Sequence, residues 1–321
     1  MTPLVTIYCM AYNHEKYIQQ TIEGFLNQKT TFPYEIIIHD DASTDRTAEI
    51  IRKYAEAHSD VIIPILQTEN KYSKGIKILK TYILPKAQGK YIAICEGDDY
   101  WCDSKKLQKQ VDWMEKHDDY TLCAHNSKYV DCSKGTIDLF NDITQDRDFT
   151  FEDILAGGKA GRTVFHTSSI LFRREYAIVP DDFVVKGIGD YPRYLYMASC
   201  GKVRCFADVM SVYRANVPGS WTNRMTTDID AQRRAIEHSQ NIRRMLDKVD
   251  VATNGHYTEY IKKTIRNMEC RELYIQGDIK RIKNQYKDIY KDLSVKRKIR
   301  LFLQARFPNV MNKYISIRRK M

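Results

Sequence analysis

The sequence has no long hydrophobic run, and this absence bears first on membranes. Apolar stretches such as residues 36–38 and 91–95 are far shorter than the roughly 20 residues that a helix needs to cross a bilayer. The first residues also lack the basic segment, apolar stretch and small-residue cleavage site of a secretory signal. We therefore expect no transmembrane helix and a cytoplasmic protein, located in the cytosol or at the inner face of the plasma membrane.

Paired cysteines are also missing. The eight cysteines form no Cys-X-X-Cys pair, which in a cytosolic chain of 321 residues argues against a zinc cluster and a disulfide framework. Cys9, Cys95 and Cys123 lie in apolar, strand-like runs and are predicted to be small core residues. Neither an internal repeat nor a low-complexity tract is present. Since 43% of the residues are hydrophobic, the chain can bury a large core, and its length favours one large domain or a domain with an appendage.

The first 125 or so residues contain a regular alternation of patterns. Short β-branched runs alternate with amphipathic helical patterns, which is typical of a parallel sheet covered by helices. The predicted strands are residues 6–9, 35–39, 61–66 and 91–95. The predicted helices are residues 17–26, a helix through 50–54 capped by Ser43, Thr44 or Asp45, residues 76–84, and a helix opened by Ser104 that carries Leu107, Val111 and Met114.

Later parts of the chain have weaker patterns. Residues 131–161 are polar and lack clear periodicity, so we expect loops there. From residue 228 onward the pattern is mostly helical, with Gly255 and Gly277 as the expected breaks between helices.

Polar residues follow three of the predicted strands directly. In open α/β sheets the ligand crevice lies beyond the carboxyl ends of the strands, so these residues are expected to converge there. Adjacent carboxylates are hard oxygen ligands, which select Mg²⁺ or Mn²⁺. The three groups are Tyr12, Asn13 and His14; Asp40 and Asp41; and Asp98 and Asp99.

These segments carry a family resemblance. Residues 6–13 (TIYCMAYN), 38–45 (IHDDASTD) and 89–99 (GKYIAICEGDD) resemble, in order and spacing, three successive motifs of family 2 glycosyltransferases of the bacterial cell-surface polysaccharide type. The resemblance is strong over residues 3–125 and moderate over 160–221. It implies the α/β GT-A fold, a Rossmann-like mixed sheet flanked by helices, with a C-terminal helical appendage.

The same resemblance implies a division into domains and a reaction. Residues 1–225 would form the GT-A catalytic domain, with a nucleotide-sugar half at about 1–125 and an acceptor half at about 126–225. Residues 226–321 would form a basic helical region. The implied activity is inverting transfer of a sugar from a nucleoside diphosphate to a hydroxyl of a glycan or a polyprenyl-diphosphate-linked acceptor, in surface polysaccharide biosynthesis.

The resemblance assigns the paired carboxylates to a metal ion. Asp99 is implied as a direct ligand of Mn²⁺ or Mg²⁺, and Asp98 as a second ligand or as a partner of the donor's ribose. The chemistry agrees, because a departing nucleoside diphosphate carries several negative charges that a cation or basic side chains must neutralise. Relatives commonly place a histidine two residues after the position of Arg214, and Asn216 stands there instead, so the second protein ligand stays open. The alternative for Asp98 and Asp99 is a simple polar turn.

Other residues are implied to bind the donor. Asp41 matches a carboxylate that accepts a hydrogen bond from the nucleobase, which favours uracil or thymine and so a UDP- or dTDP-sugar. Lys74 and Arg214 are candidates for the phosphates, and Tyr12 and Asn13 belong to the same donor side. The alternatives are an acidic cluster at a helix N-terminus, a solvated lysine and a structural arginine.

A later segment, residues 187–192, resembles the part of the family that supplies the general base. Inverting transfer needs a carboxylate that removes the proton of the acceptor hydroxyl as it attacks, and Asp190 is the candidate. Relatives often carry two acidic residues in tandem there, and Gly189 replaces the first. The alternative is a loop aspartate that caps a helix. On the acceptor side the candidates are Trp101, His166 and Trp221, with core packing as the alternative for the tryptophan at 101 and a buried, backbone-bonded ring as the alternative for the histidine.

Positive charge is confined to the C-terminal part. Residues 228–321 contain 23 lysines and arginines against 11 acidic residues, a net charge of +12, whereas the preceding residues carry a net charge of −2. A helix over residues 295–303 would have one basic and one apolar face, which suits an anionic membrane. The alternatives are packing on the domain or on a second subunit of a homodimer.

Two other functions compete with sugar transfer. A sugar-phosphate nucleotidyltransferase also uses carboxylates on an α/β sheet, but its glycine-rich phosphate loop is missing after the first strand, where residues 10–13 read Met-Ala-Tyr-Asn. The second alternative is a noncatalytic protein that binds nucleic acid or glycan through its basic tail. The acidic residues of the predicted site do not support nucleic acid as a partner, because its phosphates are also negatively charged.

Overall fold

The computed structural model describes residues 2–159, 162–217 and 231–307. Contacts divide the chain into two compact units, Met1–Val179 with Arg193–Val217, and Pro180–Pro192 with Pro218–Met321. The chain therefore enters the second unit twice. The sequence had placed residues 180–192 in the catalytic domain, whereas their contacts place them with the C-terminal helices.

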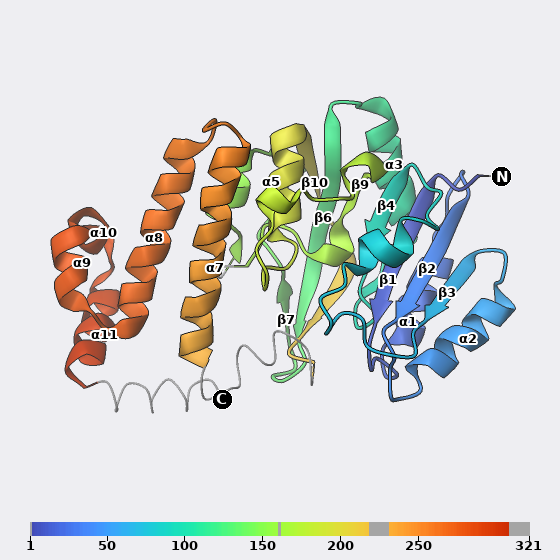
Figure 1. The fold of residues 1–321 in the computed structure, drawn as a ribbon, viewed down its shortest axis with the longest axis horizontal. Helices are drawn as coiled ribbons and strands as arrows, with labels where there is room; N and C mark the ends of the chain where they lie inside the picture. Colours follow the sequence, from blue (N-terminus) through green and yellow to red (C-terminus); the bar gives the residue numbers. More distant parts are fainter. Residues whose placement is uncertain (1, 160–161, 218–230, 308–321) are drawn as a thin grey trace. The chain divides into compact units, whose positions relative to one another are not determined.

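The first unit begins with a parallel sheet (Figure 1). Its first strand pairs in parallel with the second and the fourth, and the second pairs with the third. These four strands are β1 (Val5–Ala11), β2 (Tyr34–Asp40), β3 (Ile62–Leu66) and β4 (Tyr91–Ile94). All four were predicted from their short apolar runs, and β1, β2 and β4 are almost fully buried, as is typical of parallel strands.

The sheet continues with strands of both directions, which makes it mixed. The order among the described strands is β3-β2-β1-β4-β9-β6-β10-β5, with β7 beside β6 and β8 beside β10. Only β6 and β10 are parallel to each other in this part, and the remaining pairs are antiparallel. The bounds are β5 (Tyr100–Trp101), β6 (Tyr120–Asp131), β7 (Thr136–Leu139), β8 (Arg147–Phe149), β9 (Leu171–Arg173) and β10 (Lys202–Ala215).

Helices connect and cover the parallel strands. They are α1 (Ile18–Leu26), α2 (Thr47–Ala57), the π-helical turn η1 (Leu79–Ile83) and α3 (Lys106–Lys116), followed later by the 3₁₀ turns η3 (Thr167–Ser169) and η4 (Arg174–Tyr176) and by α5 (Tyr191–Cys200). The predicted caps of α2 are wrong, because this helix begins after Arg46 without a side-chain cap. Asp45 instead accepts hydrogen bonds from the backbone N–H groups of Glu15 and Thr47.

The expected loops at residues 131–161 contain secondary structure. The strands β7 and β8 and the helix α4 (Phe151–Ala156) lie in this stretch. A capping box starts α4: the Thr150 hydroxyl accepts from the Asp153 backbone, and the Asp153 carboxylate accepts from the Thr150 backbone. The periodicity was undetectable because β7 is largely exposed and α4 has only six residues.

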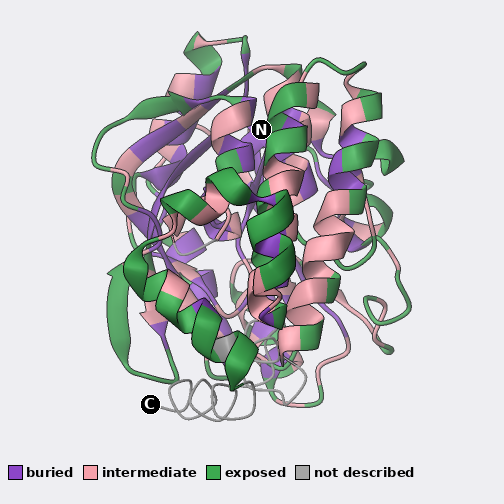
Figure 2. Ribbon diagram, turned by 90° about the vertical axis from the view of Figure 1, so that its left-hand side faces the viewer, coloured by how far each residue is buried: buried purple, intermediate pink, exposed green. Residues whose placement is uncertain are grey.

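The core of the first unit lies along its strands. Figure 2 shows buried residues concentrated on the strands, while the helices carry exposed faces. Cys9, Cys95 and Cys123 are fully buried and unpaired, as predicted. Gly89 lies against the backbone of β1, where an added Cβ atom would meet the carbonyl carbon of Val5 at 2.7 Å.

The second unit is helical in its described part. Its elements are the 3₁₀ turn η5 (Asp181–Phe183), α7 (Ala231–Ala252), α8 (Thr258–Gln276), α9 (Ile279–Gln285), α10 (Lys287–Asp292) and α11 (Val295–Arg306). The predicted breaks are confirmed, since Gly255 and Gly277 separate helices with φ angles of 73° and 75°. Lys248 of α7 donates to the carbonyls of Asp181 and Val184, which fastens the segment around η5 to this helix.

A largely buried ion pair joins two of these helices, α7 and α8. Arg243 donates two hydrogen bonds to the buried Glu272 and one to Glu269, and thereby joins α7 to α8. Among the described residues no helix combines the length and apolar character that crossing a bilayer requires.

Candidate functional site

Three carboxylates gather directly after β4. Glu96, Asp98 and Asp99 each offer an oxygen atom, and these atoms lie within 4.8 Å of one another. The turn that carries them is fixed by α1, because the Thr21 hydroxyl donates to the carbonyls of Gly97 (3.1 Å) and Asp99 (2.5 Å). The carboxylates predicted from the sequence are therefore together at the carboxyl edge of the sheet, with Glu96 as an additional member.

Asp99 is completely buried. Its Oδ1 atom accepts the backbone N–H of Arg214 at 2.8 Å, whereas its Oδ2 atom has no hydrogen-bond partner. Burial, and then the charges of Asp98 and Glu96, raise the pKa of the Asp99 carboxyl well above its ordinary value. A buried carboxylate with one unused oxygen is costly unless a positive charge or a donor completes it.

Arg214 organises the turn of the carboxylates. Its Nη1 donates to the carbonyl of Asp98 at 2.6 Å, and its Nη2 donates to the Gln20 side chain. The guanidinium lies 4.5 Å from the ring centre of Tyr100 and 5.1 Å from that of Tyr17. Two candidate roles were predicted for Arg214, binding of the donor phosphates and a structural ion pair. These contacts are structural, but the groups that accept from Arg214 are a backbone carbonyl and a side-chain amide, not an acidic side chain.

Two histidines flank the carboxylates, one on each side. The Nε2 of His14 lies 3.8 Å from Asp98 Oδ2, and the Nε2 of His166 lies 3.6 Å from Asp99 Oδ2. Burial lowers the pKa of His14 against the opposing effect of Asp98, and burial lowers the pKa of His166 to about 3. The sequence grouped His14 with its neighbours but gave it no role, and its position after the first strand was the available signal.

The loops after β1 and β2 are joined. The Asn13 side chain accepts from the backbone of Thr44 at 2.8 Å, and the Asn13 backbone donates to the Ser43 hydroxyl at 2.9 Å. The Asp40 carboxylate in turn accepts hydrogen bonds from the backbone N–H and from the hydroxyl of Ser43. Asn13 and Ala42 adopt φ angles of 57° and 62°, which are uncommon outside glycine. Tyr12, at the rim of this loop pair, is 45% exposed.

Asp41 anchors the segment predicted to bind the donor. Its two carboxylate oxygens accept the backbone N–H groups of Lys71 (2.8 Å) and Tyr72 (3.0 Å), and the Asn70 side chain donates to its carbonyl. Lys74, on the same segment, forms an exposed ion pair with Glu69. Asp41 and the segment around Lys74 are thus neighbours.

The structure corrects the sugar-stacking role of Trp101. Only 3% of this side chain is exposed, and its ring packs edge-on against Phe25 while its Nε1 donates to the Ser168 carbonyl at 2.9 Å. A ring enclosed in this way has no face to offer a sugar. His166 is also buried, and its neighbours are Asp99, Tyr213 and Ser168.

Three predicted positions need separate description. Asp190 precedes α5 and belongs to the second unit. Trp221 lies outside the described residues. Asn216, at the position where relatives carry histidine, has a φ angle of 60° and hydrogen-bonds the carboxylate of Asp131.

Comparison with known families decides the assignment. A family model described as Glycosyl transferase family 2 matches residues 6–178, which is more than half of the chain and includes the three motifs and the carboxylate turn. The chain belongs to glycosyltransferase family 2.

The chain is also similar to individual proteins and to solved structures. An uncharacterized protein of Mycobacterium tuberculosis is 34% identical over 226 residues, which cover 69% of this chain and 62% of that relative. The UDP-Glc:alpha-D-GlcNAc-diphosphoundecaprenol beta-1,3-glucosyltransferase WfaP of Escherichia coli is 39% identical over 112 residues, 35% of this chain and 41% of the enzyme. The structure of S. aureus TarS 1–349 in complex with UDP-GlcNAc superposes with a TM-score of 0.54 at 15% identity, covering 98% of this chain and 89% of that one. At this identity the likeness concerns the fold, and it confirms the predicted GT-A class.

The carboxylate turn of this family 2 chain fits a divalent cation. The available donors are carboxylate oxygens, which Mg²⁺ and Mn²⁺ prefer, and one or two of them are enough when phosphate oxygens and waters complete the coordination. The unused Oδ2 atom of Asp99 is a buried acceptor that such an ion, or a donor, would satisfy.

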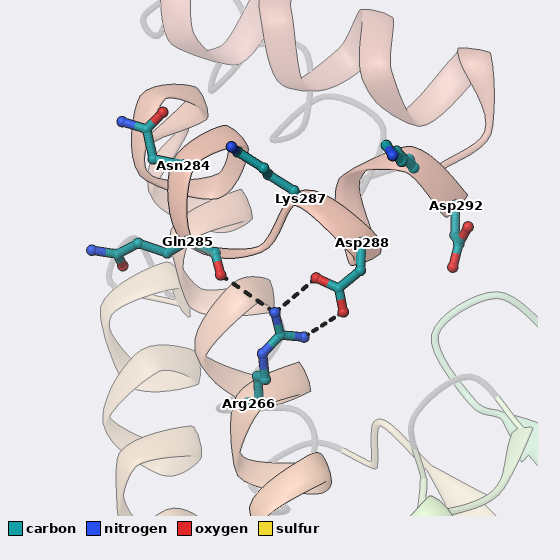
Figure 3. Close-up of a pocket in the computed structure, with 7 residues that line it drawn as sticks. Arg266, Asn284, Gln285, Lys287, Asp288 and Asp292 are labelled. Atoms are coloured by element: carbon teal, nitrogen blue, oxygen red, sulfur yellow. Dashed lines mark hydrogen bonds and ion pairs between the residues drawn. The ribbon is translucent and has the colours of Figure 1, made fainter.

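A hollow elsewhere does not have the features of such a site. A surface hollow of about 540 Å³ lies in the second unit. Figure 3 shows the side chains of α8 to α10 that line it. Its Arg266 guanidinium is already engaged by both carboxylate oxygens of Asp288. We therefore assign no ligand to it.

Proposed function

We propose that this chain is an inverting glycosyltransferase that moves a sugar from a nucleoside diphosphate to an acceptor hydroxyl in surface polysaccharide biosynthesis. The observation that carries the proposal is the cluster of Glu96, Asp98 and Asp99 at the carboxyl end of β4, in a chain of family 2. A cation in that position would face the crevice where α/β sheets bind their ligands.

Asp98 and Asp99 would hold the cation, Mn²⁺ or Mg²⁺. When bound, the ion supplies positive charge that offsets the charge of the departing diphosphate. The contribution of the protein is to fix the turn: the backbone N–H of Arg214 holds one oxygen of Asp99, and the Arg214 side chain holds the carbonyl of Asp98. A turn held in advance needs no reorganisation when the donor arrives.

The donor side would be formed by Tyr12, Asn13, Asp41, Lys74 and Arg214. Each oxygen of Asp41 accepts one backbone N–H and, as a carboxylate oxygen, can accept another, so the N3–H of uracil or thymine can still be bound. The pair between Lys74 and Glu69 is exposed to solvent, which screens the attraction between the two charges, so the ammonium is available to phosphates. The UDP-sugar donors named for WfaP and for the TarS complex support a UDP-sugar here.

Asp190 would be the general base. Inversion requires a carboxylate on the side of the sugar opposite the leaving group, which takes the proton of the attacking hydroxyl. The segment around Asp190 resembles the part of the family that supplies the base. An added Cβ at the neighbouring Gly189 would touch nothing within 4 Å, so the backbone beside Asp190 has room around it.

The acceptor would be a glycan, most simply one attached to polyprenyl diphosphate at the cytoplasmic face of the membrane. WfaP acts on a sugar carried by diphosphoundecaprenol, which supports a lipid-linked acceptor. Trp101, His166 and Trp221 were the predicted acceptor contacts, and Trp221 keeps that role in the proposal.

We further propose that α11 contacts this membrane. Leu301 is buried among the helices of the second unit, whereas Val295, Ile299, Phe302 and Leu303 are between 36% and 73% exposed. At 3.6 residues per turn these four cover an arc of about 100°, away from the direction of Leu301. Lys296, Lys298 and Arg300 border the arc, so its charge is complementary to anionic lipid.

A donor screen tests the activity. Purified full-length chain is incubated with UDP-, dTDP- and GDP-sugars, with Mn²⁺ or with chelator, and nucleotide release is measured. We expect release from one donor class, lost with chelator and reduced by about 100-fold or more in Asp99→Asn. The exposed Asp112→Asn is the matched control and should retain activity. Absence of release from every donor, together with absence of nucleotide binding by calorimetry, would contradict the proposal.

A second variant tests the base. Asp190→Asn should bind the UDP-sugar as the wild type does but lose about 10²–10⁴-fold in transfer rate. Undiminished transfer by Asp190→Asn would remove this residue from the mechanism without affecting the assignment of the cation site.

A further inference from the structure

The Oδ2 atom of Asp99 is buried and makes no hydrogen bond within the described part of the chain. The imidazole of His166 faces it, with 3.6 Å between Nε2 and Oδ2. That separation is too long for a hydrogen bond, whose N···O length is about 2.7–3.2 Å. A buried carboxylate oxygen without a partner is costly, so this position favours a positive charge that both side chains can reach.

The ring of His166 is held in place by the protein. It stacks on Tyr213, with 4.0 Å between ring centres and 26° between planes, and it lies edge-on to Phe140 at 5.3 Å. Only 8% of the residue is exposed. Because these contacts hold the ring, Nε2 is directed at Asp99 before any ligand arrives.

The other edge of the ring can carry the hydrogen. The Nδ1 atom of His166 lies 2.8 Å from the hydroxyl oxygen of Ser168, and that hydroxyl donates its own hydrogen to Ser211 at 2.9 Å. The Ser168 oxygen is therefore an acceptor for an Nδ1–H, which leaves the lone pair of Nε2 free. The backbone N–H of Ser168 also points at Nδ1, but from 3.2 Å, so the hydroxyl contact is the closer of the two.

We propose that His166 is a protein ligand of the cation, which it binds through Nε2 together with Oδ2 of Asp99. Two atoms that each lie about 2.1 Å from one ion are at most about 4.2 Å apart, and the 3.6 Å between Nε2 and Oδ2 falls within this span. The hydrogen bond from Nδ1 to Ser168 is the outer contact that orients a metal-binding histidine.

This ligand would fill a place that the sequence left open. Relatives supply a histidine at the position of Asn216, and in this chain Asn216 hydrogen-bonds the carboxylate of Asp131. His166 comes from a different element, the segment directly before the 3₁₀ turn η3. The inference rests on the proposed function, because that proposal supplies the cation.

A nitrogen ligand also affects which cation is preferred. Mg²⁺ takes oxygen ligands and keeps its waters, whereas a first-row transition metal such as Mn²⁺ accepts imidazole nitrogen as well. A site made of carboxylates and His166 should therefore bind Mn²⁺ in preference to Mg²⁺.

The first test looks for the nitrogen on the metal. Pulsed electron paramagnetic resonance is recorded on the full-length chain with Mn²⁺ and UDP, with and without ¹⁵N-labelled histidine. We expect the hyperfine coupling of a directly bound imidazole nitrogen, altered by the label and absent in His166→Gln, whose side chain offers an oxygen instead. His125→Gln is the matched control, since His125 is also buried and its Nδ1 bonds a backbone carbonyl, and it should keep the coupling.

His14 is the other histidine beside the carboxylates, with its Nε2 3.8 Å from Asp98 Oδ2. A coupling that persists in His166→Gln and disappears in His14→Gln would overturn the proposal. Absence of any nitrogen coupling in a wild type that binds Mn²⁺ would overturn it as well.

The second test measures the affinities for Mn²⁺ and Mg²⁺ by calorimetry in the presence of UDP. Loss of an outer-shell partner costs about 10- to 100-fold in metal affinity, so His166→Ala, which removes a ligand, should weaken Mn²⁺ binding by at least that much. Mg²⁺ binding should fall less, and the ratio of the two affinities should decrease. An unchanged ratio in a variant whose far-ultraviolet circular dichroism matches the wild type would contradict the proposal.

The outcomes separate this inference from the proposed function. If the wild type takes up neither cation in the presence of UDP, the cation site itself is wrong, and with it the role of His166. If the wild type takes up a cation without nitrogen coupling, only the role of His166 is wrong and the carboxylate site stands.

Discussion

Some residues outside the sequence motifs affect the stability of the protein, and Lys106 is an example. Its side chain is completely buried, donates to the Gln110 side chain at 2.7 Å and lies 4.0 Å from the centre of the Trp101 ring. Burial lowers the pKa of Lys106 to about 7. The folded protein therefore releases this proton near neutrality, while an unfolded chain keeps it up to the ordinary lysine pKa of about 10.4.

The consequence is a stability that depends on pH. Between pH about 7 and about 10.4 the unfolded state binds more protons than the folded state, so this group makes the free energy of unfolding rise with pH by up to about 1.4 kcal/mol per unit. Below pH about 7 both states are protonated and the rise is absent. Lys106→Met should abolish the rise, as measured by denaturant unfolding at several pH values. The exposed Lys105→Met should keep it, and equal slopes in wild type and Lys106→Met would contradict the prediction.

The site at this scale was partly predictable. Asp41, Asp98 and Asp99 were identified because adjacent carboxylates after apolar strands form a local pattern in the sequence. The convergence of His14 with these carboxylates was predicted from its position after the first strand. The approach of His166 to Asp99 was not predicted, because the two residues lie far apart in the chain and a lone histidine carries no periodic signal. The burial of Trp101 was missed for the same reason, since its partners come from α1 and from the 3₁₀ turn at residues 167–169.

At the scale of elements, the contact between Gly89 and β1 constrains the sheet. An alanine Cβ would meet the Val5 carbonyl carbon at 2.7 Å, and backbone cannot move aside cheaply. Gly89→Ala should therefore lower the free energy of unfolding by about 1–3 kcal/mol, measured by chemical denaturation. Gly189→Ala, where the added atom meets open space, is the control and should leave stability unchanged.

A second element-scale prediction concerns the junction of α7 and α8. Arg243 is the partner of Glu272, which is 7% exposed, so its removal leaves a nearly buried carboxylate uncompensated. Arg243→Met should destabilise the second unit by about 2–4 kcal/mol, seen as faster hydrogen exchange of the α8 amides. The exposed Arg244→Met should exchange like the wild type, and similar rates for both variants would refute the role of the pair.

Elements with strong periodicity were predicted well, and short or irregular ones were not. The strands β1, β2 and β4 were correct because apolar runs buried on both faces leave little ambiguity, and β3, which is partly exposed, was recognised from its short apolar run. The start of α2 was wrong because three residues that can cap a helix, Ser43, Thr44 and Asp45, are used instead to join the loops after β1 and β2. A cap and a loop contact use the same side-chain oxygens, and only the tertiary structure decides between them.

For the whole molecule, the separation of charge predicts how the chain associates with lipid. Residues 228–321 carry a net charge of +12, and α11 adds an exposed apolar arc. Full-length protein should sediment with vesicles containing phosphatidylglycerol, bind vesicles of phosphatidylcholine weakly, and dissociate as salt rises.

Variants of α11 check that this helix is responsible. Ile299→Ser with Phe302→Ser should weaken vesicle binding by about 10-fold or more, because about 25 cal/mol per Å² of apolar surface is no longer buried. Val251→Ser, which alters an even more exposed apolar residue of α7, is the control. Absence of binding to either kind of vesicle would exclude the membrane role, and equal binding to both would exclude the preference for anionic lipid. Loss of a dimer in the α11 variant by light scattering would identify a second copy as the occupant of this face.

The interleaving of the two units along the chain also limits how the protein can be shortened. A fragment that stops at residue 217 would retain residues 180–192 but discard α7, whose Lys248 bonds the carbonyls of Asp181 and Val184. Phe183, which is 5% exposed in the intact chain, would then be left uncovered. Such a fragment would expose an apolar segment immediately before Asp190 that no longer has its packing partner. Loss of activity or aggregation of the fragment would therefore not show whether the C-terminal helices take part in catalysis.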